Sequence, residues 1–286
     1  MKKLTLILPL YNDWKSVNLL LKKISLNLKK EKFSIHVIIV NDKSSEKIFL
    51  NKKEFKNINK VEVFNLKRNV GSQVAIFLAL KKIKKKNNNS TIVIMDSDGE
   101  DDPSKLKILI KKSQLSVNSV LFAKRIGRRE TLILRILNQI RLFLTYILTG
   151  KYLDIGNYSA FNSKNLKDIL INDHISVAYC SGVVKNIKNI NYYGIKKSKR
   201  YFGNSKVNIY FILKHSINII AVFYKEIFLR SSILYLFFLI FFSDKELNLL
   251  AFLLYLFINI FFIGCFFLNT IKDYSTKMLT NIKKIK

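Results

Sequence analysis

Five acidic residues lie within the seven positions 96–102, directly after an apolar run at 91–95. A short apolar run of this kind is typical of a buried strand, whose end would deliver Asp96 and Asp98 to one edge of a sheet. Carboxylates spaced by two can both reach one hard divalent cation, and Mg²⁺ or Mn²⁺ commonly bridges protein carboxylates and substrate phosphates. An acidic, solvated loop is the weaker interpretation, because the whole chain has only 19 Asp and Glu residues.

The elements that must position these carboxylates alternate between two patterns over the first hundred residues. Short apolar runs indicate strands, and apolar residues at helical spacing indicate helices. This order predicts an α/β fold, Rossmann-like, with a mainly parallel sheet flanked by helices. The strand-like runs are 4–8 (which Pro9 ends), 35–40, 61–66 and 91–95, and the helical stretches are 15–28 and 72–83.

Polar residues also follow the other strand-like runs. Asp13, Asp42 and Asn69 each lie shortly after one of them. In open sheets of parallel strands, ligands bind beyond the carboxyl ends of the strands, where such residues meet. One polar site, built from the ends of four strands, is therefore expected.

Four motifs around these strand ends resemble glycosyltransferase family 2 of the GT-A fold. More closely, the chain resembles the polyprenyl-phosphate glycosyltransferases, of the dolichol-phosphate mannose synthase and bactoprenol glucosyltransferase type. The resemblance covers roughly residues 1–271. The motifs are LPLYND (8–13), VNDKSS (40–45), RNVGSQ (68–73) and DSDGED (96–101), which resemble P-x-Y-N-[ED], V-D-D-G-S, R-N-x-G and D-A-D-x-Q-[DH].

The resemblance implies a role for each matching residue. The first three motifs would bind the nucleotide sugar, with Asp42 accepting from the imide of the base, and the fourth would hold Mg²⁺ or Mn²⁺ on the diphosphate. The implied nucleotide-sugar residues are Pro9, Tyr11, Asp13, Asp42, Arg68, Asn69 and Asp96. The implied metal ligands are Asp96, Asp98 and Glu100. The implied catalytic residues are Asp98, Asp101 and Arg200.

Two later segments extend the resemblance. RYFGNSK (200–206) resembles R-x-x-G-x-S-K, a loop expected to bring cationic groups to the phosphates, and IGNYS (155–159) resembles V-G-D-F-R. A basic cluster at 124–129 is interpreted as the contact for the acceptor phosphate and lipid headgroups, and a solvated basic loop is the alternative. The expected acceptor-phosphate residues are Arg125, Arg128, Arg129, Ser205 and Lys206.

The chain departs from the family pattern at four positions. Asn41 replaces the first Asp of the second motif and Lys43 replaces its Gly. Asn157 stands where the family usually has Asp, and Ser159 where it often has Arg. The last two would lie near the sugar and the acceptor, so the identity of the sugar and the class of acceptor stay open.

Composition sets two further bounds. The 286 residues carry a formal net charge of +31, yet 49% of them are hydrophobic, which excludes a wholly disordered protein. The two features are segregated along the chain, with the apolar excess at 227–271. Two cysteines make neither a disulfide framework nor a zinc site, which indicates a reducing compartment.

The C-terminal part has the character of a membrane segment. Residues 247–271 include no charge over 25 positions, enough to cross a bilayer as a helix. The shorter run 231–242 precedes a polar turn, so two transmembrane helices are expected, with a re-entrant segment as the alternative for the first. Positive charges flank both outer ends, which predicts that both termini and the N-terminal domain are cytoplasmic. The amphipathic stretch 131–148 suits either a membrane-surface helix or packing on the sheet.

These features together predict a domain order and a function. The order is a GT-A domain at 1–207, an amphipathic helix at 208–228, two spans at 229–271 and a basic cytoplasmic tail at 272–286. The function is inverting, metal-dependent transfer from a UDP- or GDP-sugar to a polyprenyl phosphate at the inner membrane. An acceptor phosphate is already ionised near neutral pH, and only a hydroxyl acceptor would need a base, for which Asp101 is the candidate.

Two other functions remain open on the sequence alone. The first is extension of a lipid-linked or surface glycan by a membrane-bound enzyme of the same family. The second is a non-catalytic basic protein that binds membrane or nucleic acid, which a sequence pI near 10.0 permits. Nucleic acid is not an expected partner, since an anionic leaflet suffices to explain the charge, and a homo-oligomer is possible.

Overall fold

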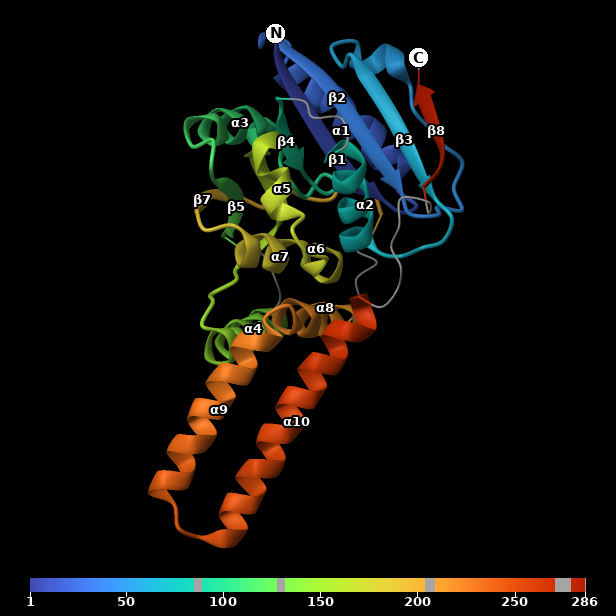
Figure 1. Cartoon of the computed structure of the whole chain (residues 1–286). Helices are drawn as coiled ribbons and strands as arrows, with labels where there is room; N and C mark the ends of the chain where they lie inside the picture. The colour runs from blue at the N-terminus through green and yellow to red at the C-terminus, as the bar shows by residue number, and fades with distance from the viewer. Residues whose placement is uncertain (85–88, 128–131, 204–208, 271–278, 286) are drawn as a thin grey trace. The chain divides into compact units, whose positions relative to one another are not determined.

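The computed structural model describes residues 1–84, 89–127, 132–203, 209–270 and 279–285 (Figure 1). The chain forms two compact units. The first consists of 1–128, 155–206 and 274–286, and the second of 129–154 and 207–273.

The first unit is built on a mixed sheet of eight strands among the described residues. Its order is β7-β5-β6-β4-β1-β2-β3-β8. The strands β3, β2, β1 and β4 are parallel, and β5 is parallel to β7, whereas β6 and β8 pair antiparallel with their neighbours. The bounds are β1 (Lys2–Leu10), β2 (Phe33–Asn41), β3 (Lys60–Leu66), β4 (Thr91–Ile94), β5 (Val120–Ile126), β6 (Ile155–Asn162), β7 (Ile190–Lys196) and β8 (Leu279–Ile285).

Helices cover this sheet because each turns an apolar stripe toward it. In α1 (Trp14–Asn27), the side chains of Val17, Leu21 and Ile24 recur at helical spacing and are fully buried. They pack in one hydrophobic core with strand residues such as Val37. The other helices of this unit are α2 (Ser72–Lys84), α3 (Leu106–Leu115), α5 (Leu166–Ile169), α6 (His174–Val177) and α7 (Tyr179–Asn186), with 3₁₀ turns at Lys52–Phe55, Pro103–Lys105 and Ser163–Asn165.

The predicted α/β fold is confirmed, and the strand-like and helical stretches of the first hundred residues form the expected elements. The sheet is more mixed than predicted, because β6 and β8 are antiparallel. The first strand also runs through Pro9 to Leu10 instead of ending there. The carbonyl of Ile7 points toward β4, where it accepts from the N–H of Met95. The main chain of Pro9 points to the same side, because main-chain groups two residues apart in a strand do so, but β4 pairs with β1 only as far as Ile7. A missing N–H at that position costs no ladder bond.

The C-terminal residues return to the sheet. The strand β8 lies along β3, and its register pairs Glu62 with Lys284 and Leu66 with Leu279 (Figure 1). The segment expected as a basic tail therefore includes, at 279–285, a strand that covers the outer edge of β3. Covering an edge removes a row of unpaired main-chain groups that would otherwise invite association.

The second unit is helical. It contains α4 (Leu132–Thr149), α8 (Ile209–Ala221), α9 (Tyr224–Phe241) and α10 (Lys245–Thr270). The stretch 208–228 is expected as one helix, but it is divided between α8 and α9, which are separated by residues 222–223. Three residues join α9 to α10, and the two helices contact each other where the rings of Tyr235 and Tyr255 stack, their centroids 5.4 Å apart.

Among the described helices, α10 alone has the length and apolar composition to cross a membrane, with a mean hydropathy of 2.5. The neighbouring α9 is 18 residues long and carries Lys225, Glu226 and Arg230. A second span is therefore not established by composition.

Candidate active site

Four parallel, adjacent strands end at the same edge of the sheet, which brings the predicted polar residues together. Asp13 follows β1, Asp42 follows β2, and Asp96 and Asp98 follow β4. The loop after β3 carries Arg68 and Asn69. These two side chains are exposed, Tyr11 is 47% exposed, and Pro9 is buried within β1.

Asp42 ties the second motif to the third. Its Oδ1 accepts from the main-chain N–H of Val70 at 2.7 Å, and its Oδ2 accepts from that of Gly71 at 2.8 Å. The carboxylate is 3% exposed, and this burial raises the pKa of Asp42 although both main-chain donors oppose the shift. Asp42 thus holds the loop after β3 in place, a role separate from its expected contact with the nucleotide base.

The departures in the second motif have local structural reasons. Asn41 donates to Asn65 Oδ1 at 2.8 Å and accepts from the N–H of Ser44 at 3.0 Å, and an aspartate could not donate the first of these bonds. Lys43 has a φ of +59°, in the left-handed region that favours the glycine usual there. The turn therefore has a backbone conformation that a glycine would adopt without strain.

The acidic loop after β4 is folded around its own main chain. Asp101 Oδ2 accepts from the N–H of Asp96 at 2.8 Å, and Asp98 Oδ1 accepts from that of Glu100 at 3.0 Å. Burial first, and the charge of Asp96 second, raise the pKa of Asp98 to about 6. The same two causes raise the pKa of Asp101, which is 5% exposed, well above its usual range. The loop thus concentrates negative charge that a cation would relieve.

A segment after β7 lies over this loop. The N–H of Ser198 donates to the carbonyl of Glu100 at 2.9 Å, and that of Tyr201 donates to the carbonyl of Asp98 at 3.0 Å. The ring of Tyr201 lies so close to Gly99 that a Cβ there would be 2.5 Å from its carbons. A glycine is therefore required at position 99 for two reasons: a side chain there would overlap the Tyr201 ring, and its φ of +89° strains any residue that has a Cβ.

The same segment brings two cations to the carboxylates. Arg200 Nη1 donates to Asp98 Oδ2 at 3.0 Å, and Arg200 Nη2 pairs with Asp13 Oδ2. Lys197 Nζ lies 2.6 Å from Glu100 Oε2. The guanidinium of Arg200 thus joins the end of β1 to the end of β4.

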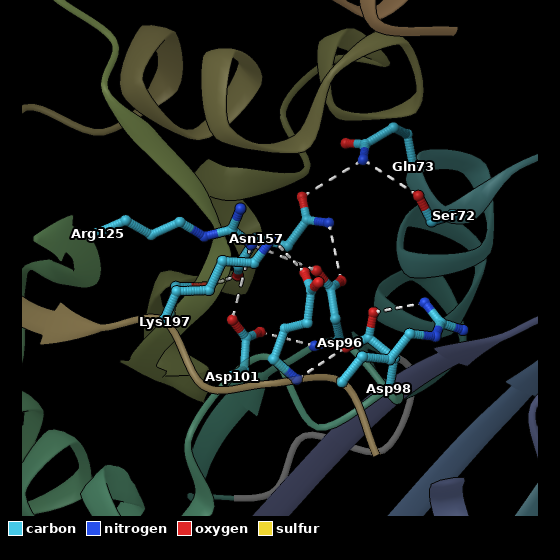
Figure 2. Close-up of polar contacts among 11 residues, drawn as sticks. Ser72, Gln73, Asp96, Asp98, Asp101, Arg125, Asn157 and Lys197 are labelled. Carbon is cyan, nitrogen blue, oxygen red and sulfur yellow. Dashed lines mark hydrogen bonds and ion pairs between the residues drawn. The ribbon is translucent and has the colours of Figure 1, made fainter. Parts of the chain in front are cut away.

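Arg125, at the end of β5, faces the acidic loop from the other side. Its Nη2 lies 3.9 Å from Asp96 Oδ2 and 3.9 Å from Asp101 Oδ1 (Figure 2). This expected acceptor-phosphate residue therefore borders the carboxylates. The other residues expected to bind that phosphate lie outside the described part of the chain: Arg128, Arg129, Ser205 and Lys206.

A metal would find only part of the expected ligand set here. Within the described residues, no group of three His, Cys, Asp or Glu side chains is gathered closely enough to hold an ion. Glu100 is paired with Lys197, while Asp96 and Asp98 repel each other. Two carboxylates with substrate phosphate oxygens are a frequent way to bind Mg²⁺, so Asp96 and Asp98 fit a cation that arrives with a diphosphate.

Sequence reasoning did not assign roles to Lys197, Tyr201 or Gln73. Lys197 and Tyr201 belong to a lysine-rich, irregular segment without periodicity, and only the glycine two residues after Tyr201 hinted at a turn. Gln73 lies within the third motif, but its amide acts on residues far away in sequence, since it accepts from the N–H of Tyr179 at 2.6 Å.

Comparisons with known proteins agree with this geometry. The profile of glycosyl transferase family 2 matches residues 5–187, more than half of the chain. A comparison with curated proteins gives no match.

Solved structures with a similar fold include glucosyl-3-phosphoglycerate synthase from Mycobacterium tuberculosis, bound to Mn²⁺, UDP and glucosyl-3-phosphoglycerate. It has a TM-score of 0.52 at 12% identity, over 79% of this chain and 80% of that one. A second mycobacterial protein has a TM-score of 0.54 at 13% identity, over 79% and 74%. TarS from S. aureus, bound to UDP-GlcNAc, has a TM-score of 0.42 at 18% identity, over 94% and 81%.

The first two likenesses show the fold, and the profile match shows the family. Together with the motif residues at four strand ends, they establish what the site is for at the level of the family. The chain belongs to glycosyltransferase family 2 and is an enzyme that transfers a sugar from a nucleotide sugar.

Proposed function

We propose that the enzyme transfers its sugar, with inversion and with the help of Mg²⁺ or Mn²⁺, to a polyprenyl phosphate at the cytoplasmic face of the inner membrane. The main observation in support of a nucleotide-sugar donor is the cluster of opposite charges at the sheet edge, where Arg200 bridges Asp13 and Asp98. A nucleoside diphosphate is complementary to this cluster, because its base and ribose would bind the residues after β1 and its phosphates would bind the cations. The donor is a UDP- or GDP-sugar.

Asp96 and Asp98 would hold the divalent ion, which would neutralise charge developing on the leaving diphosphate. The solved mycobacterial glucosyl-3-phosphoglycerate synthase is described with Mn²⁺ and UDP together, which supports this assignment. Arg200 and Lys197 would turn from their carboxylate partners toward the diphosphate as it binds. Once turned, these cations would stabilise the negative charge that develops on the leaving diphosphate.

An acceptor phosphate would need orientation more than activation, because it is ionised near neutral pH. Arg125, already bordering Asp96, is placed to orient it from the β5 side. Asp101 is a poor candidate base for a hydroxyl acceptor, since it is nearly buried and occupied by the N–H of Asp96. The burial of Asp101 therefore favours the phosphate acceptor over a sugar hydroxyl.

The helical unit supports a lipid as the carrier of that phosphate. A cavity of about 400 Å³ opens between the end of α4, α9 and α10, and apolar side chains such as Leu234, Leu250 and Ile258 line it. A cation, Arg230, lies at its wall, where Nη1 donates to the carbonyl of Ile147 at 3.4 Å. An apolar groove with a cation at its wall suits an amphiphile with an anionic head.

The exposed face of α4 supports contact with a membrane surface. Large apolar side chains remain exposed along the whole helix, among them Leu132, Ile136, Ile140, Phe143 and Ile147. A helix that keeps such a face exposed is typical of the membrane interface.

The pairing of β8 with β3 supports the proposed topology. Residues 279–285 follow α10, and they form one sheet with the N-terminal strands. If α10 crosses the membrane, the chain must cross a second time to return, and α9 is the neighbouring helix available for it. Both termini would then lie on the cytoplasmic side.

The acceptor is tested with membranes that contain the protein, given radiolabelled nucleotide sugars in turn together with Mn²⁺. Label in a mild-acid-labile, phosphatase-resistant lipid is the expected result. Label found only in a large glycan would instead establish extension of a lipid-linked or surface glycan. Membranes with the Asp98→Ala variant serve as the control and are expected to incorporate none.

Topology is tested in a chain whose Cys180 and Cys265 are changed to serine. An impermeant maleimide should label Asp244→Cys, in the turn between α9 and α10, from outside the cell. It should label Lys284→Cys only after the membrane is opened. Labelling of both from the same side would mean that the helix pair does not cross.

A further inference from the structure

A line of hydrogen bonds runs from α7 to the metal-side carboxylates. The main-chain N–H of Tyr179 donates to Gln73 Oε1 at 2.6 Å, and Gln73 Nε2 donates to Asn157 Oδ1 at 3.3 Å. Asn157 Nδ2 then donates to Asp96 Oδ1 at 3.2 Å. Figure 2 shows the last two links, with Gln73 on α2, Asn157 on β6 and Asp96 after β4.

The direction of this line is fixed by its first member. A main-chain N–H can only donate, so the oxygen of Gln73 must face Tyr179 and its nitrogen must face Asn157. The oxygen of Asn157 must then face Gln73, which leaves its nitrogen toward Asp96. Each amide orientation follows from the one before it.

A second connection holds the same two ends. The main-chain carbonyl of Asn157 accepts from Ser159 Oγ at 3.0 Å, and Ser159 Oγ lies 2.8 Å from the hydroxyl of Tyr179. Ser159 and Tyr179 are both fully buried. Asn157 is therefore held through its side chain and its main chain by one residue, Tyr179.

We propose that Gln73 and Asn157 are positioning residues, which form a one-way relay that aims the Asp96 carboxylate by giving its Oδ1 a fixed donor. The Oδ2 of Asp96 is thereby directed toward Arg125 and the substrate side. The inference rests on the proposed function only in that Asp96 acts on the diphosphate or its cation. It also gives Asn157 and Ser159, the two departures that are expected near the sugar and the acceptor, a shared structural role.

The relay requires that the group at position 157 donate a hydrogen bond to Asp96, so variants that replace this donor by an acceptor test it. Asn157→Asp keeps the shape but sets a second carboxylate about 3.2 Å from Asp96 Oδ1, where a donor was. Gln73→Glu also keeps the shape, and it still accepts from Tyr179. Its second oxygen, however, would draw the nitrogen of Asn157 away from Asp96 and turn the oxygen toward it. Both variants reverse the relay without removing an atom of bulk.

The experiment measures binding of UDP or GDP, whichever the unchanged protein binds, by calorimetry at a fixed Mn²⁺ concentration. Partners that orient a metal-binding carboxylate typically contribute 10- to 100-fold to metal affinity or activity. Asn157→Asp and Gln73→Glu are each expected to weaken nucleotide binding by about 10-fold or more. Without nucleotide or metal, the midpoint of thermal unfolding of Gln73→Glu should stay close to that of the unchanged protein, and that of Asn157→Asp should fall because of the added repulsion.

Gln114→Glu is the matched control. Gln114 Nε2 donates to Thr91 Oγ1 at 3.2 Å, outside the relay and the motifs, so the same change of amide to carboxylate should leave binding nearly unchanged. Wild-type affinity in Asn157→Asp, or an equal loss in Gln114→Glu and Gln73→Glu, would overturn the relay. A fall in unfolding temperature with unchanged affinity would show a purely structural role. Failure of the unchanged protein to bind either nucleotide would count against the proposed function instead.

Discussion

Arg200 Nη1 and Asp98 Oδ2 lie 3.0 Å apart, and they join the segment after β7 to the loop after β4. The two residues are 102 positions apart in sequence. The carboxylate that the family resemblance assigns to a divalent cation is thus paired with the side chain of Arg200. Under the proposed function, a cation and a diphosphate would replace this pairing, and Arg200 would then meet the phosphates.

The Arg200→Met variant separates these two roles, because they predict opposite changes. Affinity for Mn²⁺ without nucleotide should rise, since the internal cation that competes for Asp98 is gone. Sugar transfer should fall by about 10-fold or more, since one phosphate contact is lost. Mn²⁺ titration and initial rates measure the two quantities. Lys199→Met, an exposed change on the same segment, controls for net charge, and a rise in both quantities would contradict the account.

Gly99→Ala should destabilise the protein by about 1–3 kcal/mol, because its Cβ would overlap the Tyr201 ring in addition to straining a left-handed φ. Gly127→Ala is the matched control, since Gly127 has a φ of +66° and no atom within 4 Å of the place that a Cβ would take. Urea denaturation measures both variants. Equal losses in the two would mean that the ring contact contributes nothing.

Strand ends could be predicted from the sequence because buried parallel strands are continuous apolar runs, and the motif residues follow them directly. The partners of those residues could not. Arg200 meets Asp13 across 187 positions, a contact that no periodicity encodes. The sequence predicts a tail where β8 lies, because an edge strand pairs through its main chain and its lysines resemble those of any solvated terminus.

Lys43→Gly should stabilise the protein by about 1 kcal/mol, because Lys43 adopts a φ of +59° that costs a residue with a Cβ. Asn12→Gly is the informative counterpart. Asn12 also has a positive φ, +48°, but its Oδ1 accepts from the main-chain N–H groups of Ser45 and Glu46, so its replacement should destabilise. The fluorescence of Trp14, the single tryptophan, follows unfolding of this unit. Stabilisation in both variants would show that the hydrogen bonds of Asn12 have no net worth.

Asp98 predicts a pH dependence of stability in the metal-free protein. Its pKa is raised from 3.8 to about 6, so the folded state binds the proton more tightly than the unfolded state does. This group therefore costs stability as the pH rises from about 4 to about 6, by up to about 3 kcal/mol, and its contribution is level above that. Asp98→Asn lacks the penalty.

The free energy of unfolding of Asp98→Asn, relative to the unchanged protein, should therefore increase between pH 4 and 6 and stay constant to pH 8. Denaturation with a chelator present, at several pH values, measures it. A difference that is flat or that declines over this window would contradict the assigned burial of Asp98.

The most direct test of the central claim uses the purified protein, the nucleotide sugar that it consumes, Mn²⁺ and undecaprenyl phosphate. Mass spectrometry of the extracted lipid should show a product heavier by one sugar residue, made by the unchanged protein and absent with Asp98→Ala. If the nucleotide sugar is consumed while the lipid keeps its mass, or if Asp98→Ala makes the same product, the account is contradicted.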